Sequence, residues 1–195
     1  MKYIRYIFGI IGILSAYCHG SMPFITEDLC VTVPPHHYII PDVPRVISAI
    51  VVHFTNVDRD TTFRIFQGRG YDVNPRPVSA HYVIDRDGLL YRFVEDGHIA
   101  RHARAANSYS IGIEHIALPG ERLTAVQEQT SARLIAALCI RYGIPVENIY
   151  GHRWLAGGSF TDPCICPGDL WKTEDELRAW VMRVVVPYIV QMVED

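Results

Sequence analysis

The sequence is poor in net charge, and this scarcity excludes one broad class of function. Its 195 residues carry 18 Lys and Arg against 21 Asp and Glu, a net charge of −3 with histidine neutral. Nucleic-acid binding requires a surplus of basic side chains that neutralise phosphates. We therefore expect no nucleic-acid partner.

The sequence also lacks internal repeats, low-complexity tracts and any linker that would separate two domains. Hydrophobic residues make up 49% of the chain, which at this length predicts one globular domain with a single core. Strand-like apolar runs alternate with helical patterns. The prediction is therefore an α/β fold, a single domain with a central mixed β-sheet flanked by helices. We expect this domain to be a monomer.

No apolar segment has the length and continuity of a good membrane span. Residues 1–20 begin with two basic residues, continue without charge and end in small residues, which is the layout of a secretory signal peptide. We predict cleavage after Gly20, an exported protein that is periplasmic or secreted, and no stable membrane insertion after cleavage. A retained anchor helix is the alternative. Lipid attachment at Cys18 is less favoured, because bulky Tyr17 stands where a small residue is expected.

The remaining chain divides into an arm and a domain. Residues 21–45 are rich in proline and without periodicity, which predicts an extended arm on the surface of a domain formed by 46–195. Expected strands are 46–54, 78–84, 89–94, 110–116 and 146–151. Expected helices are a short one capped by Asp60, one opened by a capping box at Thr124 and ended by Gly143, and one from about Thr173 that Pro187 interrupts or ends.

Two histidines follow separate apolar strands. His53 ends the first apolar run, and His152 follows the short strand 146–151. Asp162 or Cys166, shortly after His152, would complete a set of three ligands. Three protein ligands leave zinc one open position, which is the arrangement of a hydrolytic site. The alternative is that both histidines are surface or hydrogen-bonded residues without a metal.

A carboxylate lies inside another apolar strand. Strand alternation places Glu114 on the face opposite Ile111 and Ile113. It could be an ordinary solvent-facing residue. In a dry cleft, burial would raise the pKa of its carboxyl and suit it to proton transfer.

Seven short motifs carry a family resemblance. They occur in one order along residues 46–171: Val51-Val52-His53, Val78–Ile84, Asp87-Gly88, Arg101-His102-Ala103, Ser110–Glu114, Gly151-His152-Arg153 and Thr161–Gly168. The chain resembles the N-acetylmuramoyl-L-alanine amidase type 2 family. That family includes zinc amidases that cleave peptidoglycan, T7-type amidase lysozymes and peptidoglycan recognition proteins.

The resemblance implies a reaction and a set of roles. Zn²⁺ would be held by His53 and His152, and Glu114 would act as general base and then as proton donor. The substrate would be peptidoglycan or a muropeptide, cleaved between the lactyl group of muramic acid and L-alanine. Substrate-binding residues would be His81, His102, Tyr82 and Arg153. The two cleft histidines could equally be wall or core residues without a role in turnover.

The sequence departs from the family pattern in two places. The third ligand is ambiguous: the spacing of ten residues from His152 favours Asp162, whereas the Cys-Pro-Gly run favours Cys166. We favour Asp162 and keep Cys166 as the alternative.

The second departure is a missing lysine. Many catalytic members have one two residues before the third ligand, where this chain has Phe160, or Cys164 in the other register. The alternative functions are therefore a non-catalytic peptidoglycan-binding module and an exported protein whose histidines bind no metal. The form of the substrate and the disulfide pairing stay open.

Overall fold

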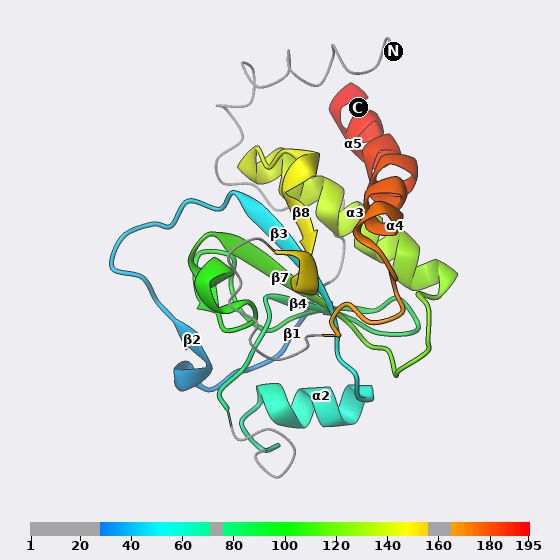
Figure 1. Cartoon of the computed structure of the whole chain (residues 1–195). Coiled ribbons are helices and arrows are strands. Elements are labelled where there is room, and N and C mark those ends of the chain that lie inside the picture. The colour runs from blue at the N-terminus through cyan, green and yellow to red at the C-terminus, as the bar shows by residue number, and fades with distance from the viewer. Residues whose placement is uncertain (1–27, 71–75, 156–164) are drawn as a thin grey trace.

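The computed structural model describes residues 28–70, 76–155 and 165–195 (Figure 1). Its centre is a six-stranded sheet in the order β1-β5-β4-β7-β3-β8. Only β4 and β5 pair in antiparallel fashion, so the sheet is mixed as predicted. The strands are β1 Asp28–Cys30, β3 Ala49–Phe54, β4 Tyr82–Ile84, β5 Leu90–Arg92, β7 Ser110–His115 and β8 Ile149–Gly151.

A second, two-stranded antiparallel sheet and several helices complete the described fold. The small sheet pairs β2 Tyr38–Ile39 with β6 Ile99–Ala100. The α-helices are α2 Arg59–Phe66, α3 Ala125–Tyr142, α4 Glu174–Trp180 and α5 Val186–Glu194, and a π-helical segment, Val181–Val185, joins the last two. Short 3-10 turns cover Pro35–His37, Arg104–Ser108, Val146–Asn148 and His152–Trp154. No helix in these ranges is long and apolar enough to cross a bilayer.

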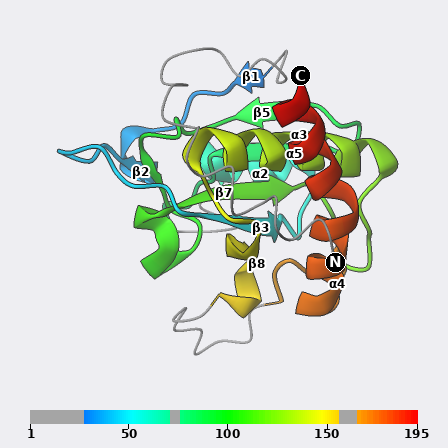
Figure 2. The ribbon, with the colours of Figure 1, turned by 90° about the horizontal axis from the view of Figure 1, so that it is seen from above.

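The alternation of the central strands divides the sheet into two faces. Ile50, Val52 and Ile113 pack with Leu138 and other residues of α3 and α4 in the main core. Figure 1 shows α3, α4 and α5 together on this side, and Figure 2 shows α5 beside α3. Because successive side chains of a strand point to opposite faces, alternate residues of β3 and β7 point away from these helices. The candidate site lies on that opposite face.

Local signals placed most helix ends correctly. Thr124 and Gln127 form the predicted capping box of α3, and Gly143 ends that helix with a φ of 64°. One detail was wrong. Asp58, not Asp60, caps α2, because its side chain accepts from the Thr61 N–H. The predicted interruption at Pro187 is present: a π-helical segment changes the hydrogen bonding just before the proline, and the helix then continues to Glu194.

The described part of the N-terminal arm is more than a surface covering. β1 extends the main sheet by pairing with β5, and Arg45 reaches into the domain. Its guanidinium donates to the carbonyl oxygens of Asp96, Asn107 and Ser110 at 2.9 to 3.0 Å. The arm is therefore anchored from residue 28 onward, whereas the predicted signal peptide lies outside the described residues.

Candidate metal centre

Three side chains from distant parts of the chain meet on the face of the sheet opposite α3, α4 and α5. His53 comes from the end of β3, His152 from the turn after β8, and Cys166 from the loop before α4. One ligand atom from each lies within 4.8 Å of the others. The imidazole rings of His53 and His152 have centroids 4.5 Å apart. The predicted meeting of these two histidines is therefore present in the structure.

The donor set fits a tetrahedral zinc ion. Zn–N bonds of about 2.0–2.1 Å and Zn–S bonds of about 2.3 Å place nitrogen and sulfur roughly 3.5 Å apart. In the structure the Cys166 Sγ lies 3.5 Å from His53 Nδ1. The spacing therefore fits two ligands of one ion, and it is also that of a hydrogen bond between the thiol and the imidazole.

Both histidines are held in the neutral form that a metal requires. Burial, followed by the neighbouring imidazoles of His152 and His102, holds the pKa of His53 well below its usual range. Burial and the nearby charge of Arg104 lower the pKa of His152 to about 4. Each ring therefore has one nitrogen with a free lone pair for a metal at neutral pH, and which nitrogen this is depends on the tautomer. The sequence pattern did not identify Arg104 as a contributor to this site.

The Cys166 thiol is positioned by its own loop and by β3. The Phe54 N–H donates to Cys166 Sγ at 3.4 Å. The Arg153 N–H donates to the Cys166 carbonyl at 2.9 Å, and the Arg153 guanidinium donates to the carbonyls of Ile165 and Gly168. Arg153, predicted to bind substrate, thus holds the loop that carries the thiol in place through hydrogen bonds.

Glu114 lies beside this cluster as the strand alternation predicts. It is the register partner of His53 in the parallel pair β3–β7, and both point to the same face. Its Oε2 atom is buried and has no hydrogen-bond partner among the described residues. Burial raises the pKa of this carboxyl to about 8. A carboxyl with that pKa can both accept and donate a proton near neutral pH.

His102 contacts the cluster directly. Its Nδ1 lies 3.1 Å from His53 Nε2. The ring fits because residue 112 of β7 is glycine: a Cβ there would lie 2.5 Å from His102 Cγ. His102 therefore lies directly behind His53, a candidate ligand, and its motif alone does not reveal that position.

Two other predicted substrate-binding residues lie in the interior. His81 is fully buried, and its Nδ1 accepts from the Gly112 N–H at 3.0 Å. Tyr82 is 1% exposed, and its hydroxyl donates to Asp96 at 2.7 Å. These contacts engage both side chains within the domain, and their contact with substrate stays a prediction. Asp162, the favoured third ligand, lies outside the described residues.

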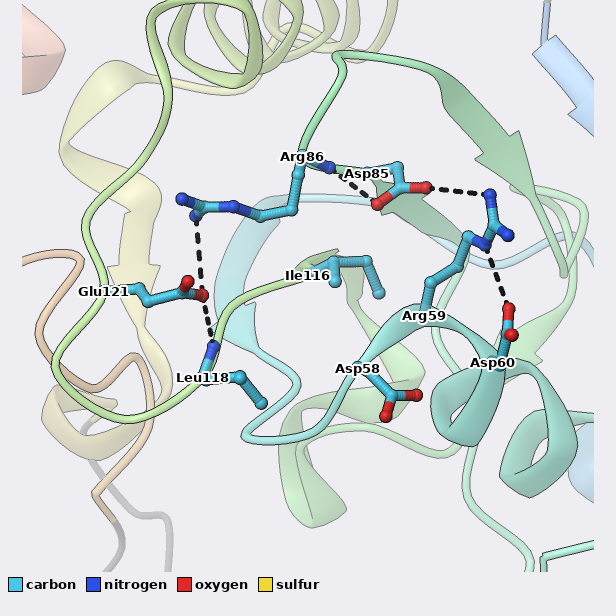
Figure 3. A pocket seen from close by; sticks show the side chains of 8 residues that line it. All are labelled: Asp58, Arg59, Asp60, Asp85, Arg86, Ile116, Leu118 and Glu121. Carbon is cyan, nitrogen blue, oxygen red and sulfur yellow. Dashed lines mark hydrogen bonds and ion pairs between the residues drawn. The ribbon is translucent and has the colours of Figure 1, made fainter.

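A separate pocket of about 370 Å³ opens where β3, β4 and β7 end (Figure 3). Its charged groups are largely paired with one another: Arg59 contacts Asp60 and Asp85, and Arg86 contacts Glu121. Asp58 caps α2. None of the three metal-cluster residues lines this pocket.

Comparison with known proteins provides independent information. The family model described as N-acetylmuramoyl-L-alanine amidase matches residues 43–169. N-acetylmuramoyl-L-alanine amidase A of Achromobacter lyticus is 36% identical over 101 residues, 50% of this chain and 54% of that protein. The 1,6-anhydro-N-acetylmuramyl-L-alanine amidase AmpD of Citrobacter freundii is 35% identical over 94 residues, 44% of this chain and 50% of that protein. The matches thus span about half the length of these curated relatives.

Solved structures share the fold over a larger part of the chain. The crystal structure of a selenomethionine AmpD derivative superposes with a TM-score of 0.63 at 27% identity and covers 84% of this chain and 99% of that one. The structure of PlyL has a TM-score of 0.61 at 20% identity and covers 82% of this chain and 97% of that one.

Proposed function

We propose, because this chain belongs to the N-acetylmuramoyl-L-alanine amidase family, that it is a zinc-dependent hydrolase of peptidoglycan. The bond cleaved is the amide between the lactyl group of muramic acid and L-alanine. The observation that carries this proposal is the meeting of His53, His152 and Cys166 within 4.8 Å, beside the buried carboxylate oxygen of Glu114. Three ligands and an adjacent acid–base group are the parts that metal-assisted amide hydrolysis needs.

Glu114 and the two histidines would have different roles in this reaction. Bound zinc would supply Lewis-acid polarisation of the scissile carbonyl and would activate a water molecule. Glu114 takes a proton from the attacking water and then delivers it to the nitrogen of the departing L-alanine. Its buried Oε2 atom, which has no hydrogen-bond partner among the described residues, is free to bind that proton. His53 and His152, neutral before metal binding, hold the ion and do not exchange protons during the cycle.

We propose Cys166 as the third protein ligand. Its support is the 3.5 Å separation from His53 Nδ1 and the N–H donor from Phe54, which favours a thiolate. The prediction of Asp162 from sequence spacing stays untested. The variants Cys166→Ala and Asp162→Ala separate the two by zinc content. Cys166→Ala should lose most of the metal and Asp162→Ala should keep it; the reverse result would assign the aspartate.

The function itself is tested with purified protein and purified sacculi. Zinc content is measured alongside release of stem peptide, and a muropeptide with a 1,6-anhydro sugar is offered in parallel to identify the preferred form. Chelation should abolish release and added zinc should restore it. Undiminished release from the chelated protein would refute the metal-dependent mechanism. Zinc or wall binding without release would instead identify a binding module.

We also propose that residues 1–20 act as a signal peptide and that the mature protein is periplasmic or secreted. The support is the basic start, the uncharged apolar stretch and the small residues at its end. Mass spectrometry of the protein from fractionated cells tests this. An intact N-terminus in the cytoplasmic fraction would contradict it.

A further inference from the structure

We infer that His102 and Ser110 are positioning residues that set the tautomer of His53, so that its Nδ1 lone pair faces the metal. This inference rests on the proposed metal-dependent function and concerns how the chain prepares a ligand. A series of hydrogen bonds runs from the Ala106 carbonyl through Ser110, the first residue of β7, and His102 to His53. Each bond in the series fixes which atom donates in the next.

The direction of the series is fixed at its inner end. The Ser110 Oγ lies 2.6 Å from the Ala106 carbonyl oxygen. A carbonyl oxygen only accepts, so the serine hydroxyl hydrogen points to Ala106. Ser110 is fully buried, so water does not compete for that hydrogen. The serine oxygen is thereby left as an acceptor.

The second link determines where His102 carries its proton. The His102 Nε2 lies 3.4 Å from the Ser110 Oγ. Because that oxygen accepts, Nε2 is the protonated nitrogen of the neutral imidazole and Nδ1 is bare. The backbone N–H groups of His102 and Ala103 both donate to Asn107 Oδ1, at 3.0 and 2.6 Å. These bonds hold the segment that carries the ring.

The hydrogen bond between His102 and His53 then sets the tautomer of His53, the proposed metal ligand. The bare Nδ1 of His102 lies 3.1 Å from His53 Nε2 and accepts a hydrogen bond from the Nε2–H group of His53. A neutral imidazole has one N–H, so His53 Nδ1 is left with its lone pair. This is the nitrogen that lies 3.5 Å from Cys166 Sγ. Outer partners of this kind fix the tautomer and orientation of a metal-binding histidine, and their loss typically lowers metal affinity by about 10–100-fold.

The opposite direction makes a different prediction. If His102 carried its proton on Nδ1, it would donate to His53 Nε2, and His53 would carry its own proton on Nδ1. That proton would then have to leave or move before a metal could bind. The two directions are distinguishable in the metal-free protein.

Nitrogen-15 NMR of the histidine-labelled full chain, freed of metal by chelation at neutral pH, reads the tautomers directly. We expect the Nε2–H tautomer for both His53 and His102. An Nδ1–H tautomer at His53 would overturn the inference. This measurement needs neither bound zinc nor turnover, so it can succeed even where the proposed amidase activity fails.

Zinc affinity, measured by competition with a chelator, provides the second test. His102→Leu removes the acceptor and should weaken zinc binding by about 10–100-fold. His102→Asn keeps an acceptor near the position of Nδ1 and should recover most of that loss. His36→Gln removes an exposed imidazole as a matched control and should bind zinc as the unaltered chain does.

Equal zinc affinity in folded His102→Leu and in the unaltered chain would overturn the inference. If that variant does not fold, the tautomers of the unaltered chain decide the question alone. An unaltered chain that binds no zinc would overturn both the inference and the proposed function. Tight zinc binding with the expected tautomers but no peptide release would overturn only the amidase proposal.

Discussion

Replacing Glu114 with glutamine should show separately how the buried carboxyl affects the stability of the protein and how it affects turnover. The folded state raises the pKa of this carboxyl from its ordinary value of 4.5 to about 8. A raised carboxyl pKa means that the folded state binds the proton more tightly than the unfolded chain does. Stability contributed by the protonated form is therefore lost as pH rises from about 4.5 to about 8.

The magnitude follows from the width of that window. Each pH unit between the two pKa values costs about 1.4 kcal/mol. Because the unfolded chain releases this proton at pH 7 and the folded chain retains it, the metal-free protein should be roughly 3 kcal/mol less stable at pH 7 than below pH 4.5 on account of Glu114. Glu114→Gln is uncharged at every pH and should not show this slope. Relative to the unaltered chain, the variant should gain stability steadily between pH 5 and pH 8.

The assay is urea unfolding of the metal-free protein at several pH values. Removing the metal matters because a bound cation would favour the carboxylate. Glu147→Gln, at an exposed position, is the matched control and should follow the pH dependence of the unaltered chain. Parallel stability profiles for Glu114→Gln and the unaltered chain would refute the reasoning. With zinc added, the same variant should keep the metal and lose turnover by about 100-fold or more.

Three further substitutions test the site and its support. Gly112→Ala places a Cβ against the His102 ring and should weaken zinc binding without deleting a polar group; unchanged affinity would show that the ring can relocate. Arg153→Ala removes donors to the Cys166 loop and should weaken zinc binding, and Arg153→Lys, which has no planar fork, should not restore it. Leu138→Ala, in the core, should lower the unfolding free energy by about 2–5 kcal/mol while a folded variant keeps its zinc.

Local patterns in the sequence were sufficient where neighbours along the chain decide the structure. The capping box at Thr124 and the glycine at 143 define α3, because the bonds involved join residues a few positions apart. The alternation around Ile113 placed Glu114 on the face away from the helices, because a strand reverses its side-chain direction at each residue. Apolar strands ending at His53 and before His152 predicted that these rings meet.

Tertiary contacts decided the rest. His53 and His102 are 49 positions apart, and His53 and Cys166 are 113 apart, so no local pattern specifies either contact. Arg153 donates to a carbonyl of a loop 15 positions away, and Tyr82 donates to Asp96 inside the domain, contacts that their motifs do not specify. The sequence by itself determined five strands of the central sheet, the main helices and the candidate donors, because propensity and periodicity act over a few residues, whereas it did not predict β1 and β2 in the arm. Only the folded chain determined which donors share one point in space, because strand order and loop paths depend on packing between distant segments.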